Sequence, residues 1–304
     1  AGEIGVDAFA SIQDAIDNLA ENGTIHVADG TYTENLSITQ NLTLLSDNGR
    51  DVTFINGISG VGASGAITIS NATTGVNIGE YHQGFTILGI DNGNPAIENA
   101  TIYLEGSHSG LNITSNEIIA NGEAGLLSEW SAAITSTTIW DNIFSGQTFI
   151  GDTPAGDGFS QQFSLDNVPR QLVSFGGGTT SNNSLISFLA NQITGTTGGI
   201  NSEGIEQSNN LVTIDAQNST ISGNTFNGTA TSGAYALRVR GSGQSTIIDN
   251  YFYSDNMGVH TGHVIALIPK VSSQLSNFGQ ILNHLNNFDG GAYIAELPAV
   301  MVGI

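Results

Sequence analysis

The sequence predicts an all-β protein, a single right-handed parallel β-helix of about ten rungs with a short N-terminal α-helical cap. Three observations lead to this fold class. One amphipathic helical segment opens the chain, only short strand-like segments follow it, and a short motif recurs five times. A recurring motif with this spacing is typical of a solenoid, in which each unit buries its apolar face against its neighbours.

The first element is an amphipathic helix. Apolar side chains recur at helical spacing between Asp7 and Leu19, and we expect a helix there, with Asp7 as its N-cap and Gly23 in its stop signal. The strand edges at the end of a stack must be covered to prevent aggregation, and this helix is placed to cover them. We therefore assign residues 1–23 to an N-terminal capping segment and residues 24–304 to the β-helix.

Short strands come next. Residues 24–27, 36–38 and 42–44 are rich in β-branched residues or leucine and are separated by turn residues. Near the end of the chain, residues 271–288 show a partly helical spacing and the last eight residues are apolar and uncharged. We assign residues 271–304 to a last coil or cap, and a strand that docks on the next molecule would have the same composition.

The recurring motif is a small polar residue, Ile or Phe, two variable residues, Asn, one variable residue, and again Ile or Phe. Its asparagines are spaced by 26, 49, 33 and 26 residues. A unit of about 25 residues, once doubled and once lengthened by a loop, accounts for these steps. The five asparagines are Asn116, Asn142, Asn191, Asn224 and Asn250.

These asparagines predict a ladder at one corner of the coil. Successive coils stack at about 4.8 Å, so like residues lie above like residues. An inward Asn bonds to its neighbours above and below, satisfies backbone groups of the turn, and tolerates the left-handed backbone that corners require. We interpret this column as structural.

Three stretches near the N-terminus carry a family resemblance. They are Phe9-Ala-Ser-Ile12-Gln-Asp-Ala-Ile16, Gly23-Thr-Ile25-His-Val27 and Gly30-Thr-Tyr32-Thr-Glu34-Asn-Leu36. Together they resemble the start of right-handed parallel β-helix proteins of the pectin-lyase-like superfamily, which includes pectin methylesterases and surface proteins. The resemblance extends over most of the chain through Gly84-Phe85-Thr-Ile87 and the Asn-x-Phe copies, and it implies the fold and its handedness.

The resemblance implies no particular activity. Enzymes of this superfamily keep their catalytic groups on the outer face of central coils. The Asn-Thr-Asp, Gly-His-Gly and Arg-Ile-Lys motifs of polygalacturonases do not occur in this sequence. The Asp-Phe-Ile-Phe-Gly stretch of pectin methylesterases and the Asp-Pro-His-Glu of alginate epimerases do not occur either.

Composition narrows the classes of partner. Five Lys and Arg residues stand against 27 Asp and Glu, for a formal charge of −22, so the chain has no basic footprint for nucleic acid or anionic lipid. No apolar stretch approaches the roughly 18 residues that span a bilayer. A mostly neutral polar surface is typical of secreted bacterial surface proteins. The chain opens on Ala-Gly-Glu, and we expect an extracellular or cell-surface protein whose signal peptide has been removed.

Two functions remain. The leading hypothesis is a non-catalytic structural or assembly protein, or one that binds polysaccharide, with another copy of itself or a glycan as partner. The rival is a lyase or epimerase, because such enzymes need cations to neutralise a uronate carboxylate and a base to remove the C5 proton. Arg238 and Arg240 alternate with apolar residues and should point outward. Stacking would join them to a patch one coil later; its candidate residues are Arg238, Arg240, His260, His263 and Lys270.

An outward apolar column points to a covered or binding surface. The residue two before each ladder Asn should face solvent, yet three of the five, Trp140, Leu189 and Ile248, are large and apolar. Either a loop covers them, for which residues 145–183 are the candidate, or a protein or sugar does. The aromatic side chains that could stack on sugar rings are Trp130, Trp140, Tyr81 and Tyr103.

Oxygen-rich turns are candidates for calcium, which prefers clustered carboxylate and amide oxygens. None of them matches a complete calcium-binding motif, so we expect no required cofactor and treat calcium as optional. The candidate ligands are Asp91, Asn94, Glu98, Asp152 and Asp157.

Overall fold

The structure is a computed structural model of the whole chain. It describes residues 8–302 apart from a series of gaps, which are 61–62, 71, 91–98, 122–123, 130–131, 147–171, 177–181, 198, 201–205, 208–210, 231–234, 241–244, 256–257, 262–264, 268–286, 290–292 and 296–299.

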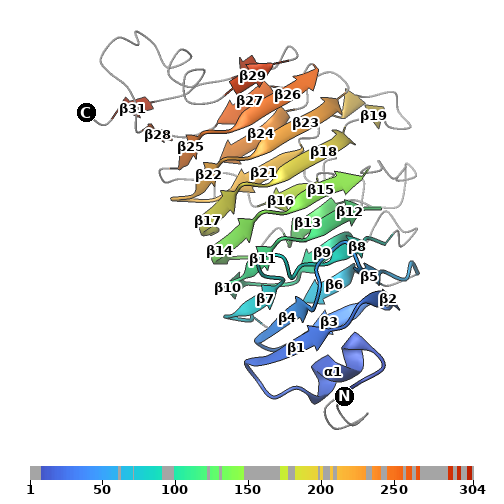
Figure 1. Cartoon of the computed structure of the whole chain (residues 1–304). Coiled ribbons are helices and arrows are strands. Elements are labelled where there is room, and N and C mark those ends of the chain that lie inside the picture. The colour runs from blue at the N-terminus through green and yellow to red at the C-terminus, as the bar shows by residue number, and fades with distance from the viewer. Residues whose placement is uncertain are drawn as a thin grey trace, which may run out of the picture.

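The described strands form three parallel sheets, and successive strands of the chain pass from one sheet to the next (Figure 1). Each sheet grows by one strand per coil. The first sheet contains β1 (Gly23–Val27), β4 (Leu42–Ser46), β7 (Val76–Ile78), β11 (Asn112–Thr114), β14 (Ile134–Trp140), β17 (Ser184–Leu189), β22 (Thr220–Ser222) and β25 (Thr246–Ile248), with β10 (His108–Ser109) also paired to β14.

The other two sheets follow the same order along the chain. The second contains β2 (Gly30–Thr33), β5 (Thr53–Asn56), β8 (Thr86–Leu88), β12 (Glu117–Ala120), β15 (Ile143–Gly146), β18 (Gln192–Thr197), β23 (Thr225–Ala230), β26 (Tyr251–Asp255) and β29 (Asn287–Asp289). The third contains β3 (Leu36–Ile38), β6 (Gly65–Ile69), β9 (Ala100–Leu104), β13 (Ala124–Ser128), β16 (Val173–Phe175), β21 (Val212–Asp215), β24 (Tyr235–Arg240), β27 (Gly258–Thr261) and β30 (Tyr293–Ala295).

This topology confirms the predicted parallel β-helix. Its core is a stack of aliphatic and aromatic side chains in register, as in the column Ile113, Ile139, Phe188 and Ile221, each at most 1% exposed. Burying each such side chain stabilises the fold by roughly 1.5–3 kcal/mol. The coils therefore depend on their neighbours for stability.

The N-terminal helix is shorter than predicted. Helix α1 spans Ile12–Asn18, and its N-cap is Ser11, whose backbone is extended and whose hydroxyl oxygen accepts a hydrogen bond from the Asp14 N–H. The predicted start at Asp7 is therefore wrong, and Asp7 itself lies outside the described residues. Ser11 is the better N-cap because its hydroxyl reaches the N–H of Asp14, three residues later. The spacing of the apolar residues alone did not indicate this start.

Helix α1 covers the lower edge of the third sheet. The Gln13 side chain bonds to the exposed edge of β3, where its Oε1 accepts from the Ser37 N–H and its Nε2 donates to the Ser37 carbonyl. The Glu34 carboxylate accepts from the first two backbone N–H groups of the helix, those of Ile12 and Gln13. One end of the stack is thus closed through side-chain amides and carboxylates.

The 49-residue step in the motif is one coil, not two. Strand β14 pairs directly with β17, and the chain between them contributes one strand to each of the other sheets, β15 and β16. The predicted doubling is wrong. The covering loop predicted over residues 145–183 is also wrong as one segment, because β16 and the buried Asn183 lie within it.

The C-terminal part continues the stack. Strands β29 and β30 pair with β26 and β27, so they add a further coil to the second and third sheets. Two smaller sheets complete the described chain: β28 (Ile265–Leu267) pairs in parallel with β31 (Val300–Val302), and β19 (Gly199–Ile200) pairs antiparallel with β20 (Glu206–Gln207). Residues 271–286 of the predicted cap lie outside the described residues.

Candidate functional site

The motif asparagines form a hydrogen-bonded column at the corner between the first and second sheets. In each step the backbone N–H and the side-chain Nδ2 of one Asn donate to the Oδ1 of the Asn in the next coil, at 2.9–3.3 Å. Each Nδ2 also donates to a carbonyl of the coil below. The five side chains are 0–1% exposed, so this column has no surface for a ligand.

The left-handed backbone at this corner belongs to the residue before each Asn. Ser115, Asp141, Ala190 and Asp249 have φ values of 52–57°, and Gly223 has 68°. The expectation that the Asn itself carries this conformation is therefore not met. The Asn side chain forms the ladder, while the preceding residue makes the turn; of these preceding residues, Ala190 and Asp249 are exposed and Ser115 is buried.

The residues two before each Asn form a vertical row. Thr114, Trp140, Leu189, Ser222 and Ile248 are register partners in successive strands of the first sheet. Its three large apolar members, Trp140, Leu189 and Ile248, which were predicted to face outward, lie in different surroundings. Ile248 packs against the hydrophobic core, Leu189 is half-buried, and Thr114 is buried. Trp140 is the member of this row with an aromatic partner among the described residues.

That partner is Tyr81, from the turn between β7 and β8. The centroids of the Tyr81 and Trp140 rings are 5.7 Å apart and the ring planes differ by 25°. Tyr81 is 60% exposed, which makes it the most exposed large hydrophobic side chain of the described chain. The side chain that packs on Trp140 thus comes from an earlier coil. The partial burial of Trp140 therefore does not require residues 145–183, which were predicted to cover this row.

Two long turns place these groups. The corners of later coils need two residues, but the chain uses residues 47–52 after β4 and residues 79–85 after β7. The two turns are bonded together: the Ser46 hydroxyl donates to the Gly84 carbonyl, and the Gln83 carbonyl accepts from the Ser46 N–H. At Gly49, with φ of 93°, a Cβ atom would lie 2.8 Å from the His82 carbonyl oxygen, so only glycine allows this approach.

The turn after β4, residues 47–52, places Arg50 beside the end of β14, the strand that ends at Trp140. A guanidinium nitrogen of Arg50 donates to the backbone carbonyl of Asp141 at 3.3 Å, and the Arg50 carbonyl accepts from the Thr86 hydroxyl. Within the part of the chain that the structure describes, no carboxylate forms a salt bridge with Arg50. We call the group formed by Arg50, Tyr81, His82, Trp140 and Asp141 the aromatic corner.

Carboxylates border the aromatic corner. The Asp141 carboxylate accepts from the Ser115 hydroxyl at 2.7 Å, and that of Glu117 accepts from the Thr86 hydroxyl at 3.3 Å. The His82 ring lies 3.8 Å from that of Tyr81, with a tilt of 51°. Exposed rings, a guanidinium and carboxylates side by side can contact the faces and hydroxyl groups of a polar, ring-shaped ligand.

The cationic patch is only partly assembled. Arg238 and His260 are register partners on β24 and β27, and Leu237 and Val239 face the core, so Arg238 has the outward position that was predicted. His263 and Lys270 lie outside the described residues.

The sequence reading missed a carboxylate in this row. Asp215 is the register partner of Arg240 on the neighbouring strand, and Thr213 is that of Arg238. Asp215 is fully buried although it alternates with the core residues Val212 and Ile214. In the strand sequence Val-Thr-Ile-Asp, apolar and polar residues alternate, which is typical of a carboxylate that faces outward. The sequence alone does not show that Asp215 is in register with Arg240.

The calcium candidates receive no structural support. Asp91, Asn94, Glu98, Asp152 and Asp157 all lie outside the described residues. In the described ranges, no three His, Asp or Glu side chains are grouped so that they could hold a metal ion. Trp130 also lies outside these ranges, and Tyr103 is buried in a small cluster with Leu127, so neither joins the aromatic corner.

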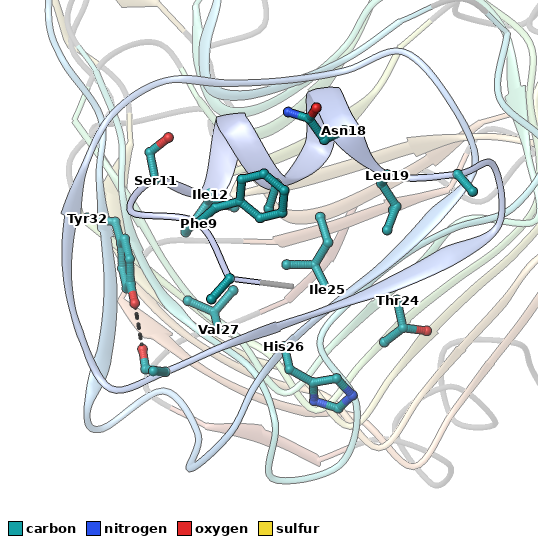
Figure 2. A pocket seen from close by; sticks show the side chains of 14 residues that line it. Phe9, Ser11, Ile12, Asn18, Leu19, Thr24, Ile25, His26, Val27 and Tyr32 are labelled. Atoms are coloured by element: carbon teal, nitrogen blue, oxygen red, sulfur yellow. Dashed lines mark hydrogen bonds between the residues drawn. The ribbon is translucent and has the colours of Figure 1, made fainter. Parts of the chain in front are cut away.

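A hollow of about 740 Å³ lies at the N-terminal end, between α1 and β1 (Figure 2). Its lining is mostly apolar and includes Phe9, Ile25 and Val27. The titratable side chains of the lining already have partners. The Tyr32 hydroxyl donates to the Ala28 carbonyl, and the His26 ring lies 3.5 Å from the Asp47 carboxylate. This hollow lies beside the helical cap at the end of the hydrophobic core, and its lining has no acid and base pair.

Comparisons with known proteins give fold likeness only. No protein-family model matches the sequence, and no curated protein matches it significantly. A carrot pectin methylesterase is 11% identical with a TM-score of 0.46, over 96% of this chain and 86% of that one. A pectin methylesterase from Erwinia chrysanthemi is 12% identical with a TM-score of 0.44, over 86% and 78%. An alginate lyase from Paenibacillus sp. is 13% identical with a TM-score of 0.40, over 93% and 95%.

Since these scores are low, the fold rests on the strand pairing within the chain itself. In addition, no helix in the described ranges has the length and hydropathy needed to cross a bilayer.

Proposed function

We propose that this chain is a glycan-binding β-helix protein that acts outside the cell and binds its ligand at the aromatic corner. The observation that carries this proposal is the stack of Tyr81 on Trp140. An aromatic side chain that is 60% exposed and held in place by a second ring offers a rigid apolar face at low entropic cost.

The surroundings of the stack support a polar ligand. The Arg50 guanidinium can donate, and the carboxylates of Asp141 and Glu117 can accept. Arg50 bonds to the carbonyl of Asp141, the residue after Trp140, and the Thr86 hydroxyl bonds to both the Arg50 carbonyl and Glu117. The β-helix holds these groups rigidly, because the two turns are tied to each other and to the corner by backbone hydrogen bonds. Little order must be gained when a ligand binds, which favours affinity.

Tryptophan fluorescence tests the proposal. The chain has two tryptophans, so a Trp130→Phe variant reports on Trp140 alone. This variant is titrated with a panel of soluble polysaccharides. A saturable change in emission with one glycan, lost in Tyr81→Ala, supports the proposal. The matched control is Leu185→Ala, which removes another exposed apolar side chain and should leave binding unchanged. A panel without any saturable change counts against the proposal.

Catalysis on an acidic glycan is the second candidate. It is favoured by the register of Asp215 with Arg240 and of Arg238 with His260, which puts a carboxylate, two arginines and a histidine on neighbouring strands. A lyase would give unsaturated uronates, which absorb in the ultraviolet. Product formation that is lost in Arg238→Ala but retained in Tyr81→Ala would support this candidate, whereas no product from any polyuronate would oppose it.

Assembly into filaments is a third property that the sequence predicted. Strand β31 pairs with β28 of the same chain, so one edge of the C-terminal strand is already used. Electron microscopy of the purified chain tests for end-to-end rods. A dispersed monomer at every concentration would leave glycan binding as the function and remove assembly.

A further inference from the structure

We propose that the aromatic corner selects neutral saccharides over polyuronates. The inference rests on the proposed function and names its ligand class. It departs from the sequence-based expectation of an acidic glycan, because it depends on the charges around Trp140 and not on the cationic patch in the later coils.

Charge is the first argument. Arg50 is the only lysine or arginine among the first 169 residues, which hold 20 Asp and Glu residues. Two of these carboxylates, Asp141 and Glu117, border the aromatic corner, and Glu80 is exposed next to Tyr81 in the chain. A polyuronate carries a carboxylate on each sugar, so one guanidinium cannot offset the repulsion from this surface within a Debye length of about 8 Å.

Hydrogen-bonding chemistry is the second argument. An ionised carboxylate only accepts hydrogen bonds and can accept several, so Asp141 and Glu117 can take donors from a ligand in addition to the hydroxyls of Ser115 and Thr86. Sugar hydroxyl groups donate, and a uronate carboxylate does not. The guanidinium of Arg50 donates to the Asp141 carbonyl at 3.3 Å, and its other N–H groups can donate to a hydroxyl or ring oxygen. The set therefore matches a neutral polyol better than an anion.

Geometry agrees with a ring lying flat on Tyr81. The inner face of Tyr81 is occupied by Trp140, while 60% of the side chain remains exposed. The apolar C–H face of a neutral pyranose can pack on such a ring while its equatorial hydroxyl groups reach the polar rim. Aromatic side chains at other hydrated interfaces likewise combine an apolar ring contact with polar contacts at the edge.

The test uses neutral and acidic forms of the same backbone. Homogalacturonan is neutral when fully methyl-esterified and anionic when de-esterified, and dextran and galactomannan extend the neutral set. Binding is measured by Trp140 fluorescence in the Trp130→Phe variant, at low and high salt. We expect at least one neutral glycan to bind ten times more tightly than either de-esterified homogalacturonan or alginate at low salt. Salt should narrow this difference, because it screens the repulsion.

Two further variants separate charge from shape. Asp141→Asn and Glu117→Gln keep the side-chain size and remove the charge, so together they should raise the affinity for de-esterified homogalacturonan several-fold. Tighter binding of a polyuronate than of every neutral glycan, still lost in Tyr81→Ala, overturns the selectivity but leaves glycan binding intact. Absence of binding to the whole panel overturns both the selectivity and the proposed function.

Discussion

Tyr81 and Trp140 stack although they are far apart in the chain: Tyr81 leaves the corner that follows β7, and Trp140 ends β14, two strands further along the first sheet. The contact exists because a long turn rises along the outside of the β-helix. The later corners have no room for such a turn, since a left-handed residue and a ladder Asn complete them. Among the described residues, the exposed aromatic stack thus lies where the long corners give way to the short ones.

This contact should be measurable as a coupling energy. Tyr81→Ala and Trp140→Ala should each destabilise the fold, and the double variant should cost less than the sum by about 0.5–1.5 kcal/mol, because the ring contact can be lost only once. Urea unfolding of the four proteins measures this cycle. The pair Tyr81→Ala and Leu185→Ala is the control and should be additive; additivity of Tyr81 with Trp140 would contradict the stack.

The ladder makes a stronger prediction. Asn191 accepts from the backbone N–H and side chain of Asn142 and donates to Asn224 and to the Ile139 carbonyl. Asn191→Ala leaves at least two buried polar groups without partners, at about 1–3 kcal/mol each, so we expect a loss of about 3 kcal/mol or more. Asn227→Ala, at an exposed Asn on β23, should change stability by less than about 0.5 kcal/mol.

A charged replacement extends this test. Asn191→Asp removes the Nδ2 donor and puts a carboxylate against the Ile139 carbonyl and the Asn224 Oδ1, both acceptors. We expect it to be less stable than Asn191→Ala at neutral pH and to recover part of the loss in acid, where the carboxyl group can donate again. Equal stability of the two variants at neutral pH would argue that the side chain leaves the ladder.

The sequence predicted the fold well because the β-helix is periodic. A column such as Ile113, Ile139 and Phe188 repeats one local pattern, so the motif carried both the register and the inward face. The same reasoning failed where the period is interrupted. The insertion before Leu172 looked like an extra coil, because the length of an insertion says nothing about how many strands it holds.

The candidate site was harder to predict, since it depends on the interruptions. Trp140 and Tyr81 were both recognised as candidate sugar contacts, but nothing in the sequence brings residue 81 to residue 140. Arg50 was not among the predicted site residues. Its role depends on how far the turns of two early coils rise along the surface, which is set by the hydrogen bonds between Ser46, Gln83 and Gly84.

The N-terminal cap should control association. Gln13 occupies the edge of β3 through Ser37, so Gln13→Ala exposes a backbone donor and acceptor at the end of the third sheet. We expect a stability loss of about 1 kcal/mol and a concentration-dependent increase in light scattering. Glu21→Gln, an exposed residue at the same end, is the control and should stay monodisperse. Unchanged scattering in Gln13→Ala would indicate that α1 protects the edge without this side chain.

His108 gives the fold a dependence on pH that can be assigned to one residue. Its side chain is buried; the imidazole Nε2 lies 3.0 Å from the Glu105 carbonyl and the Nδ1 lies 2.9 Å from the Thr73 hydroxyl. A carbonyl only accepts, so Nε2 carries the proton and Nδ1 accepts from Thr73. Burial lowers the pKa of His108 below its ordinary value, although hydrogen bonds to the Glu105 and Ile69 backbones and the Glu105 charge oppose the shift.

Stability should therefore fall as the pH drops below the pKa of an unfolded histidine, about 6.5. In that range the unfolded chain binds a proton that folded His108 does not, so protonation favours unfolding, and the loss ends below the folded pKa. We expect His108→Asn to flatten the stability curve below about pH 6.5. Thr73→Val should narrow the pH range of the effect, because neutral Nδ1 loses its hydrogen-bond donor and the folded pKa of His108 rises toward the unfolded one. Urea midpoints at each pH measure the effect, and an NMR titration gives the pKa directly. A slope that is the same in His108→Asn and the parent chain would assign the pH dependence to other groups.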